Sequence, residues 1–319
     1  MRHLLAAACF LPAIAQADEL RLSQPIDCTL GADCHIQQFV DRDTGPGARD
    51  FMCSSLTYDG HNGTDFALVF DNDIEDGVAV LAAAAGTVTA VRDGMADAVQ
   101  GRPGAPDVSD RECGNGVVVE HDDGWETQYC HMRSGSVIAE VGQEVEAGTP
   151  LGQVGLSGQT EFAHVQLSVR KDGEVVDPFE PNDLNSCDGE AQSLWADDLG
   201  YAPGAILAVD WSDHVPDYDQ IKTGAAEDFE VGRNDPALVL WMFAYGARTG
   251  DQVRMGFDGP AGETFETEIE IDRPQARYFR AGGRRTPDGG WPAGDYTGFV
   301  EILRGGDVID RMETAITLD

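Results

Sequence analysis

A ten-residue stretch near the middle of the chain alternates between polar and apolar side chains. Within residues 161–170, valine and leucine take the odd positions from 165 to 169, and His164, Gln166 and Ser168 take the even ones. Successive side chains of a β-strand point to opposite faces, so this pattern predicts a strand with one face in a core and its polar face along a cleft.

The region upstream of this strand is punctuated by glycine. Residues 77–91 favour two short strands with a tight bend, and residues 117–129 predict a hairpin that turns at Asp-Asp-Gly, with His121 on the surface. Residues 93–112 lack any period and predict a long exposed loop. In residues 141–155, glycines separate single apolar positions, which indicates short strands in a small antiparallel barrel or sandwich.

The composition changes after residue 180. Residues 181–205 are rich in Pro, Asn, Asp and Gly and predict a linker. Six alternating or apolar runs follow at sandwich-like spacing: Ala237–Tyr245, Val253–Phe257, Phe265–Ile271, Ala276–Phe279, Tyr296–Leu303 and Val308–Leu318. The chain is therefore expected to be all-β, with an Ig-like β-sandwich over residues 206–319.

The first seventeen residues have the pattern of a secretory signal. A basic start at Arg2 and His3 precedes a short apolar run and an Ala-Gln-Ala cleavage site at residues 15–17. No later segment reaches the ~18 apolar residues of a membrane span. We therefore expect an exported protein, periplasmic or extracellular, in which residues 18–56 form an N-terminal segment held by disulfides.

The charge and the cysteine content narrow the class of protein that the sequence predicts. The 319 residues include 57 Asp and Glu against 21 Lys and Arg, a net charge of −36, which disfavours binding to nucleic acid or to an anionic membrane. Six cysteines remain after residue 17, and an even number in an exported chain indicates disulfides. Cys28 and Cys34 can close a local loop, and Cys113 and Cys130 bracket the predicted hairpin, which would leave Cys53 and Cys187.

Histidines and an aspartate suggest a metal site built from separate strands. His61 and Asp65 lie four residues apart beside glycines, His131 follows the predicted hairpin, and His164 lies on the cleft face of the central strand. Imidazole and carboxylate groups are common zinc ligands. Biotinyl and lipoyl carriers share glycine-rich hairpins of this kind, but they need a lysine at a hairpin tip, and residues 141–155 contain none.

These motifs also occur in a collinear order that resembles the lysostaphin/LytM-type zinc metalloendopeptidases, which cut peptide cross-bridges in bacterial cell walls. The similarity covers about residues 57–180, the predicted peptidase-like domain. It is carried by Gly60-His61-x-Gly63-x-Asp65, Gly114-Asn115-Gly116-Val117, Tyr129-x-His131, the glycine-rich stretch from Gly142 to Gly152, and His164-x-Gln166.

The resemblance implies antiparallel sheets with a groove and assigns a role to each matching residue. His61 and Asp65 match two zinc ligands, His131 matches the residue that polarises the scissile carbonyl, and His164 matches the general base. Zinc lowers the pKa of its bound water to about 7, so that a nearby imidazole can take the proton.

The chain departs from the family pattern at Gln166, where the family has its third zinc-ligating histidine. A neutral amide oxygen is a weaker zinc ligand than an imidazole nitrogen. We therefore favour a protein directed at peptidoglycan peptides with impaired or lost zinc catalysis. The alternatives are an active endopeptidase, a non-catalytic regulator of a wall hydrolase, and a plain binding sandwich in which the histidines are accidental.

Overall fold

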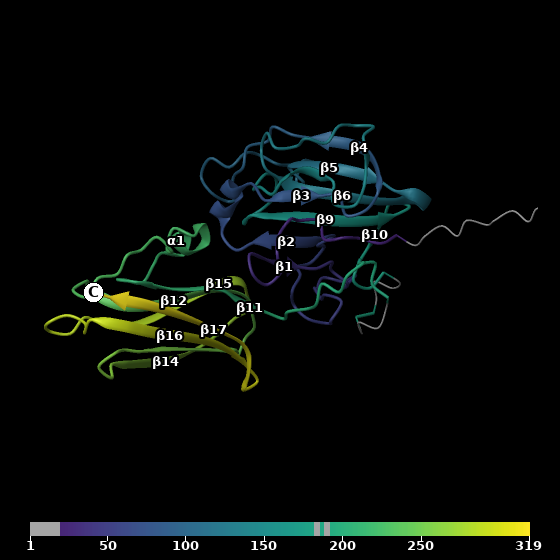
Figure 1. The fold of residues 1–319 in the computed structure, drawn as a ribbon. Helices are drawn as coiled ribbons and strands as arrows, with labels where there is room; N and C mark the ends of the chain where they lie inside the picture. The colour runs from purple at the N-terminus through teal and green to yellow at the C-terminus, as the bar shows by residue number, and fades with distance from the viewer. Residues whose placement is uncertain (1–19, 182–185, 188–191) are drawn as a thin grey trace, which may run out of the picture.

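The computed structural model describes residues 20–181, 186–187 and 192–319, and the predicted signal segment and part of the predicted linker lie outside these residues. The described chain forms two β-rich parts (Figure 1). We call residues 20–181 the N-terminal part and residues 205–319 the C-terminal part. The all-β prediction is confirmed, since the described residues contain only three short helical segments besides strands, turns and loops.

The N-terminal part is built on one antiparallel sheet. Its strands run in the order β1 (Cys34–Gln38), β2 (Thr64–Leu68), β9 (His164–Lys171), β6 (Trp125–Met132), β5 (Asn115–Glu120), β4 (Gly86–Arg92) and β7 (Glu144–Val145), with β10 (Glu174–Val176) also paired to β9. A smaller ribbon pairs β3 (Ala79–Leu81) with β8 (Pro150–Gln153). The short 3₁₀ segments are η1 (Asp71–Asp76) and η2 (Asp122–Gly124).

The central strand β9 follows the alternation of its sequence. Val165 and Leu167 are 0% exposed and belong to the hydrophobic core of this part, while Gln166 remains half-buried on the other face. The predicted hairpin and the two short strands of residues 77–91 are also present. The prediction that His121 is a solvated surface residue is wrong. The residue is half-buried, and its ring nitrogens lie 2.6 Å from the carbonyl oxygen of Ala85 and 2.8 Å from the hydroxyl of Thr127.

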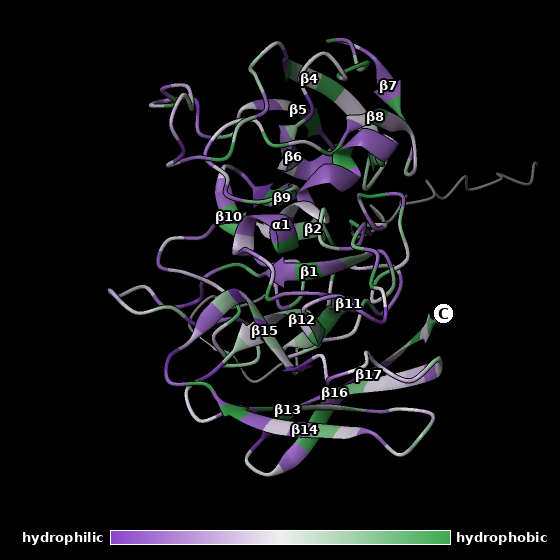
Figure 2. Cartoon of the chain, turned by 90° about the vertical axis from the view of Figure 1, so that its left-hand side faces the viewer, coloured by the Kyte–Doolittle hydropathy of each residue, from purple (hydrophilic) through white to green (hydrophobic). Residues whose placement is uncertain are grey.

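The C-terminal part is a sandwich of two antiparallel sheets, and the six predicted runs all form strands. One sheet has the order β11 (Ala205–Ser212), β12 (Ala237–Ala247) and β15 (Gln275–Arg285), and the other β14 (Thr264–Glu270), β13 (Gln252–Asp258), β16 (Gly294–Arg304) and β17 (Asp307–Leu318). The sequence pattern did not predict β11 or the short helix α1 (Tyr218–Thr223). In the hydropathy colouring, green segments recur along strands of both parts (Figure 2).

An apolar cluster joins the two parts. Phe70 of the N-terminal part packs with Ile221, Trp241 and Phe243 of the C-terminal part, and the rings of Phe70 and Phe243 are stacked at 6.1 Å. Figure 1 shows α1 above β12 and β15, on the side that faces the N-terminal part. The burial of these large side chains indicates that the parts pack tightly against each other.

Three disulfides connect the six described cysteines in the pairs that the sequence suggested. Cys28 pairs with Cys34, and Cys113 pairs with Cys130. The pair Cys53–Cys187 spans 134 residues and ties the N-terminal segment to the chain that follows β10. Closing such a long loop lowers the entropy of the unfolded chain.

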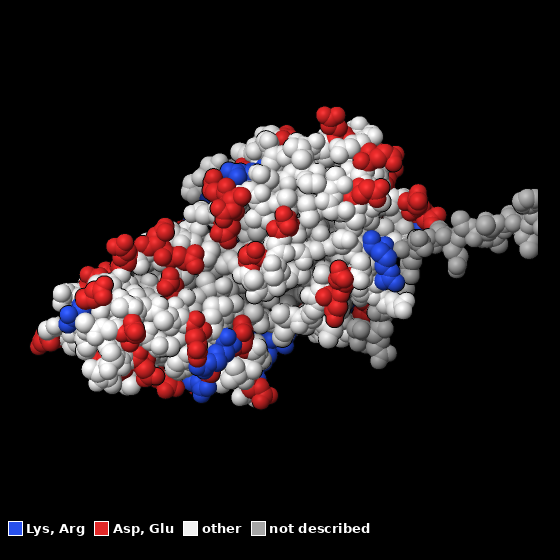
Figure 3. Space-filling view, viewed as in Figure 1, with Lys and Arg blue, Asp and Glu red and all other residues white. Residues whose placement is uncertain are grey.

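The surface is acidic. Figure 3 shows Asp and Glu side chains over both parts of one face, with few Lys and Arg side chains among them. No helix within the described residues is long and apolar enough to cross a membrane.

The strand β1 brings a buried histidine to the boundary between the parts, and this predicts a pH-dependent stability. The ring of His35 lies 4.5 Å from that of Tyr245, and Gln37, its hydrogen-bond partner, donates to the carbonyl of Ala276. Burial, reinforced by the charge of Arg277, lowers the pKa of His35 from 6.5 to about 3. As the pH falls below 6.5, His35 binds a proton in the unfolded chain but not in the folded chain, so the folded state loses stability.

His35 alone should therefore lower the free energy of unfolding by about 2 kcal/mol between pH 7 and pH 5. Urea unfolding at the two pH values measures this loss, with His35→Gln as the comparison. The variant should lose about 2 kcal/mol less than the natural protein over the same interval. Equal losses in both proteins would contradict the assignment.

Candidate metal centre and groove

The strand register of the main sheet brings the candidate residues together. Across β2 and β9, Asp65 lies directly opposite Gln166, and across β6 and β9 Gln166 lies opposite Cys130, the residue before His131. Cross-strand neighbours have Cβ atoms about 5 Å apart, so their side chains share one face of the sheet. The site therefore follows from pairing three strands that are far apart in the sequence.

A β-bulge aims His131 into the site. The register of β5 and β6 shifts between Asn115 and Val117, and His131 has a φ of 65°, in the left-handed region that residues other than glycine rarely adopt. Gly116 makes the close approach possible, because a Cβ there would lie 2.4 Å from the carbonyl oxygen of Tyr129. Such strained residues are held in place by their surroundings and cluster at functional sites.

The three imidazoles of the site share one hydrogen-bond pattern. Their Nδ1 atoms lie 2.8 Å from the Phe39 carbonyl oxygen for His61, 2.8 Å from that of Ser157 for His131 and 2.9 Å from that of Phe162 for His164. An Nδ1–H that donates to a carbonyl fixes the tautomer of a neutral ring and leaves the Nε2 lone pair free. In each ring, Nε2 is therefore the atom available to a ligand, a proton or a metal.

Two of these Nε2 atoms converge on one carboxylate oxygen. Asp65 Oδ1 lies 3.1 Å from His61 Nε2 and 3.6 Å from His164 Nε2. The three residues and His131 are at most 4% exposed. A buried carboxylate needs a partner, and the imidazoles provide it.

Burial and the carboxylate set the protonation of the site. Burial opposes protonation of His61, but the Asp65 carboxylate and the Phe39 carbonyl outweigh it and raise the pKa of His61 above 6.5. Although burial favours a neutral Asp65, the neighbouring His61 and His164 lower the pKa of Asp65 below its ordinary value. Without a metal, His61 and Asp65 therefore form a hydrogen-bonded ion pair.

The other two histidines are kept neutral. Burial, together with the nearby His164, lowers the pKa of His131 to about 4. Burial also lowers the pKa of His164, and Asp65 offsets this only in part. Neutral imidazoles can accept a proton or a hydrogen bond at Nε2.

Gln166 takes part in a hydrogen-bond network beside the histidines. Its Oε1 lies 3.3 Å from His131 Nε2, and its Nε2 donates to Asn62 Oδ1 at 2.8 Å and to Ser168 Oγ at 3.2 Å. Gly63 leaves room for this side chain, because a Cβ there would lie 2.7 Å from Gln166 Cγ. The amide is thereby tied to its neighbours rather than directed at Asp65.

Two cavities lie on either side of His131 and Gln166. One has a volume of about 400 Å³ and the other about 290 Å³, and four residues line both: Tyr58, His131, Gln159 and Gln166. Tyr58 is 52% exposed, and its ring lies 4.6 Å from that of His61. We call the two cavities together the groove, since these four residues belong to both.

Sequence reasoning assigned no role to Tyr58, Asn62 or Gln159, although the first two flank the Gly60-His61 motif. Gln159 and the lining residues from the C-terminal part, Lys222 and Arg277, had no sequence signal, because only the fold brings them to the groove. A larger cavity of about 600 Å³ lies near His35 and Tyr245 and contains none of the predicted site residues.

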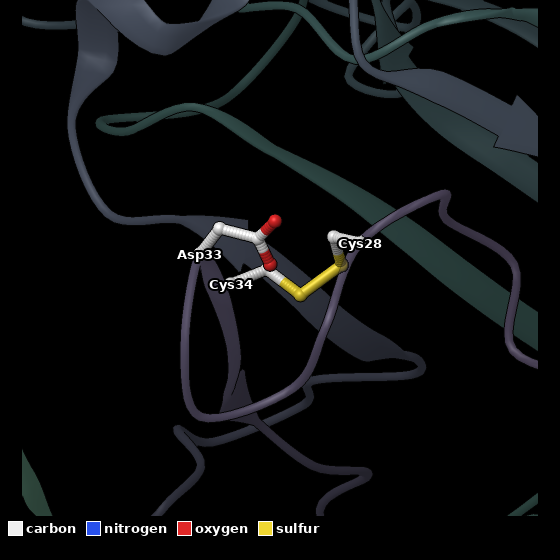
Figure 4. Close-up of side chains that lie close together, drawn as sticks. All are labelled: Cys28, Asp33 and Cys34. Carbon is white, nitrogen blue, oxygen red and sulfur yellow. A yellow bond between two sulfur atoms is a disulfide. The ribbon is translucent and has the colours of Figure 1, made fainter.

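The described residues do not provide zinc with a complete set of strong donors at this site. Only one group of three His, Cys, Asp or Glu donor atoms within 4.8 Å of one another occurs among them, namely Cys28, Asp33 and Cys34. Figure 4 shows that the two sulfurs of that group form a disulfide, so they are not free thiolates for a metal. At the groove, His61 and Asp65 suit zinc, and Gln166, across the strands from Asp65, offers only a neutral amide.

Residues 59–178 match the model of peptidase family M23. The match includes all five candidate positions, and the resemblance to lysostaphin/LytM-type peptidases is confirmed. This segment of the chain therefore resembles a domain of that metallopeptidase family, and it contains every strand of the main sheet except β1.

Solved structures also show similarity to part of the chain. A mutant catalytic domain of the prophage-encoded M23 protein EnpA from Enterococcus faecalis is 25% identical, covers 44% of this chain and 88% of its own, and gives a TM-score of 0.29. The catalytic domain of lysostaphin from Staphylococcus simulans is 20% identical over 37% of this chain and 76% of its own, with a TM-score of 0.27. The SpoIIQ–SpoIIIAH pore-forming complex contains a chain that is 21% identical over 50% of this chain and 90% of its own, with a TM-score of 0.34.

Proposed function

We propose that the protein binds peptidoglycan peptides in its groove and that zinc-dependent hydrolysis at this site is impaired or lost. The observation that carries this proposal is the network of Gln166. By the family resemblance its position matches the third zinc ligand, and its amide nitrogen donates to Asn62 and Ser168 instead.

The chemistry of the remaining donors supports an impaired site. Catalytic zinc sites use three protein ligands, so the loss of one imidazole leaves no reserve. Zinc would also have to displace the proton that His61 shares with Asp65 at 3.1 Å. Both effects weaken metal binding, and we derive no catalytic step through zinc.

The groove retains groups that suit a peptide. The neutral imidazoles of His131 and His164 can accept hydrogen bonds from peptide N–H groups, and the amide of Gln159 can donate to carbonyls. The exposed ring of Tyr58 can cover an apolar side chain of the ligand. The predicted signal segment and the disulfides support an exported location, where such peptides occur.

An active zinc endopeptidase is the second candidate, and one observation favours it. His61 Nε2 and His164 Nε2 lie 3.1 Å and 3.6 Å from one oxygen of Asp65, and the ring of His131 lies 4.6 Å from that of His164. If Gln166 or a water molecule completes the ligand set, His131 and His164 remain as bases near the metal. Zinc-saturated assays of wall cleavage distinguish this candidate from the first.

Binding is tested by sedimentation of the purified protein with insoluble peptidoglycan. Tyr58→Ala should weaken binding about fivefold or more, because removal of an exposed aromatic side chain at the centre of a contact costs at least about 1 kcal/mol. Ile138→Ser is the matched control, since Ile138 is 65% exposed and lines neither cavity of the groove. If the natural protein stays in the supernatant, or if both variants lose binding equally, the groove is not the binding site.

A further inference from the structure

The segment that leads into β9 positions His164. The ring of Phe162 is stacked on that of His164, with 4.4 Å between centroids and 24° between planes. The carbonyl of the same Phe162 accepts the Nδ1–H of His164 at 2.9 Å. The direction of His164 Nε2 therefore depends on where Phe162 lies.

Side chains of the C-terminal part hold this segment. The guanidinium carbon of Arg277, on β15, lies 5.3 Å from the ring centroid of Phe162, on a ring that also contacts His164. Lys222, on α1, donates from Nζ to the carbonyl of Glu161 at 2.8 Å. An arginine against an aromatic ring and a charged donor on a carbonyl are among the stronger polar contacts in proteins.

Asp71 connects the same two cations to the next residue of the segment. Its Oδ1 accepts the backbone N–H of Ala163 at 3.1 Å and lies 3.5 Å from Arg277 Nη1. Its Oδ2 lies 3.7 Å from Lys222 Nζ. Three consecutive residues before His164 are therefore held, directly or through Asp71, by two side chains of the C-terminal part.

The side chains that make these contacts are largely buried, which strengthens the electrostatic interactions between them. The side chains of Arg277 and Asp71 are 5% and 7% exposed, and that of Lys222 is 12% exposed. Arg277 also lies 4.6 Å from the ring centroid of Phe243 and donates to the carbonyl of Val69. Removing one partner of a buried ion pair leaves an uncompensated charge, and the surrounding segment shifts to relieve it.

We propose that Arg277 and Lys222 are positioning residues for His164, which makes the C-terminal part a component of the groove. The same two side chains, with Tyr218 and Ala276, also line the cavity of about 400 Å³ beside the histidines. This inference goes beyond the proposed function, because it concerns the position of His164 whether or not the groove binds zinc or a peptide.

The test uses the full mature chain with ¹⁵N-labelled histidine, and records the ring nitrogen signals of His164 by NMR, assigned from their loss in His164→Gln. Arg277→Met should shift or broaden the His164 signals and leave those of His121, at the far hairpin, in place. Arg280→Met is the matched control on the same strand, since Arg280 lies over Tyr278 and donates to the carbonyl of Phe279. It should leave the His164 signals unchanged.

Lys222→Met gives a second, less buried disruption and keeps the test decisive if Arg277→Met fails to fold. It should also shift the His164 signals, since it frees the Glu161 carbonyl. His164 signals that superimpose on those of the natural protein in either folded variant would overturn the proposal. A melting temperature lowered equally in Arg277→Met and Arg280→Met, with His164 unchanged, would assign Arg277 a purely structural role.

Discussion

Gln166→His should raise the affinity of the protein for zinc by about a hundred-fold. Dividing ~10–16 kcal/mol of structural zinc binding over four ligands gives ~3 kcal/mol for each, which is about two orders of magnitude in the dissociation constant. The strand register supports the gain, because position 166 lies opposite Asp65 and beside His131. Gly63 provides the space for a ring, as it does for the present amide.

Competition with a chromophoric zinc chelator measures this change in affinity. Gln128→His is the matched control, because it places the same substitution on β6, in the lining of the smaller cavity, but opposite Ser168 instead of Asp65. The control should leave the zinc affinity close to that of the natural protein. Equal affinities for the natural protein and Gln166→His would show that position 166 is not a ligand position.

Arg42→Met should lower the free energy of unfolding by about 3–5 kcal/mol, the range observed when one partner of a buried ion pair is removed. Arg42 is 1% exposed, and its Nη1 lies 3.0 Å from Asp177 Oδ2 and donates to the carbonyl of Glu180 at 2.9 Å. Without the guanidinium, Asp177 remains buried beside Glu180 with no cation.

The cost of Arg42→Met should depend on pH. Burial already raises the pKa of Asp177 to about 6, against the opposing charge of Arg42. Loss of Arg42 raises this pKa further, so Asp177 is neutral at pH 5 and the destabilisation is smaller there than at pH 8. Urea unfolding of the natural protein and of Arg42→Met at pH 5 and pH 8 measures this difference in destabilisation. The control is Arg102→Met at the exposed Arg102–Asp219 pair, which should change stability little. A similarly small change in the free energy of unfolding of Arg42→Met would contradict the stabilising role of the buried Arg42–Asp177 ion pair.

Local pattern was sufficient for much of the fold and for the face that carries the site. The alternation around His164 predicted β9 and the side of it that meets the groove, because a strand buried on one face carries a period of two in its sequence. The C-terminal strands were equally predictable from the sequence, since their apolar runs are separated by glycine-containing turns. The collinear motifs then located His61, Asp65 and His131.

The features that the sequence did not predict depend on long-range contacts. β1 was missed because its polar residues His35 and Gln37 are buried, with Tyr245 and Ala276 of the distant C-terminal part among their partners. The left-handed backbone of His131 arises from a bulge opposite Gly116, which no local period indicates. The contribution of Arg277 to the groove has the same origin, because 113 residues separate it from His164 and only the packing of the two parts brings them together.

The central claim is that the groove binds wall peptides without cutting them at a normal rate. The most direct measurement incubates the natural mature protein with purified peptidoglycan at saturating free zinc and counts newly released amino groups by mass spectrometry. The account predicts that the protein sediments with the wall and releases new amino groups far more slowly than Gln166→His, at or near the level of His61→Ala. Release by the natural protein as fast as by Gln166→His, lost in both His61→Ala and His131→Ala, would contradict the account and establish an active endopeptidase.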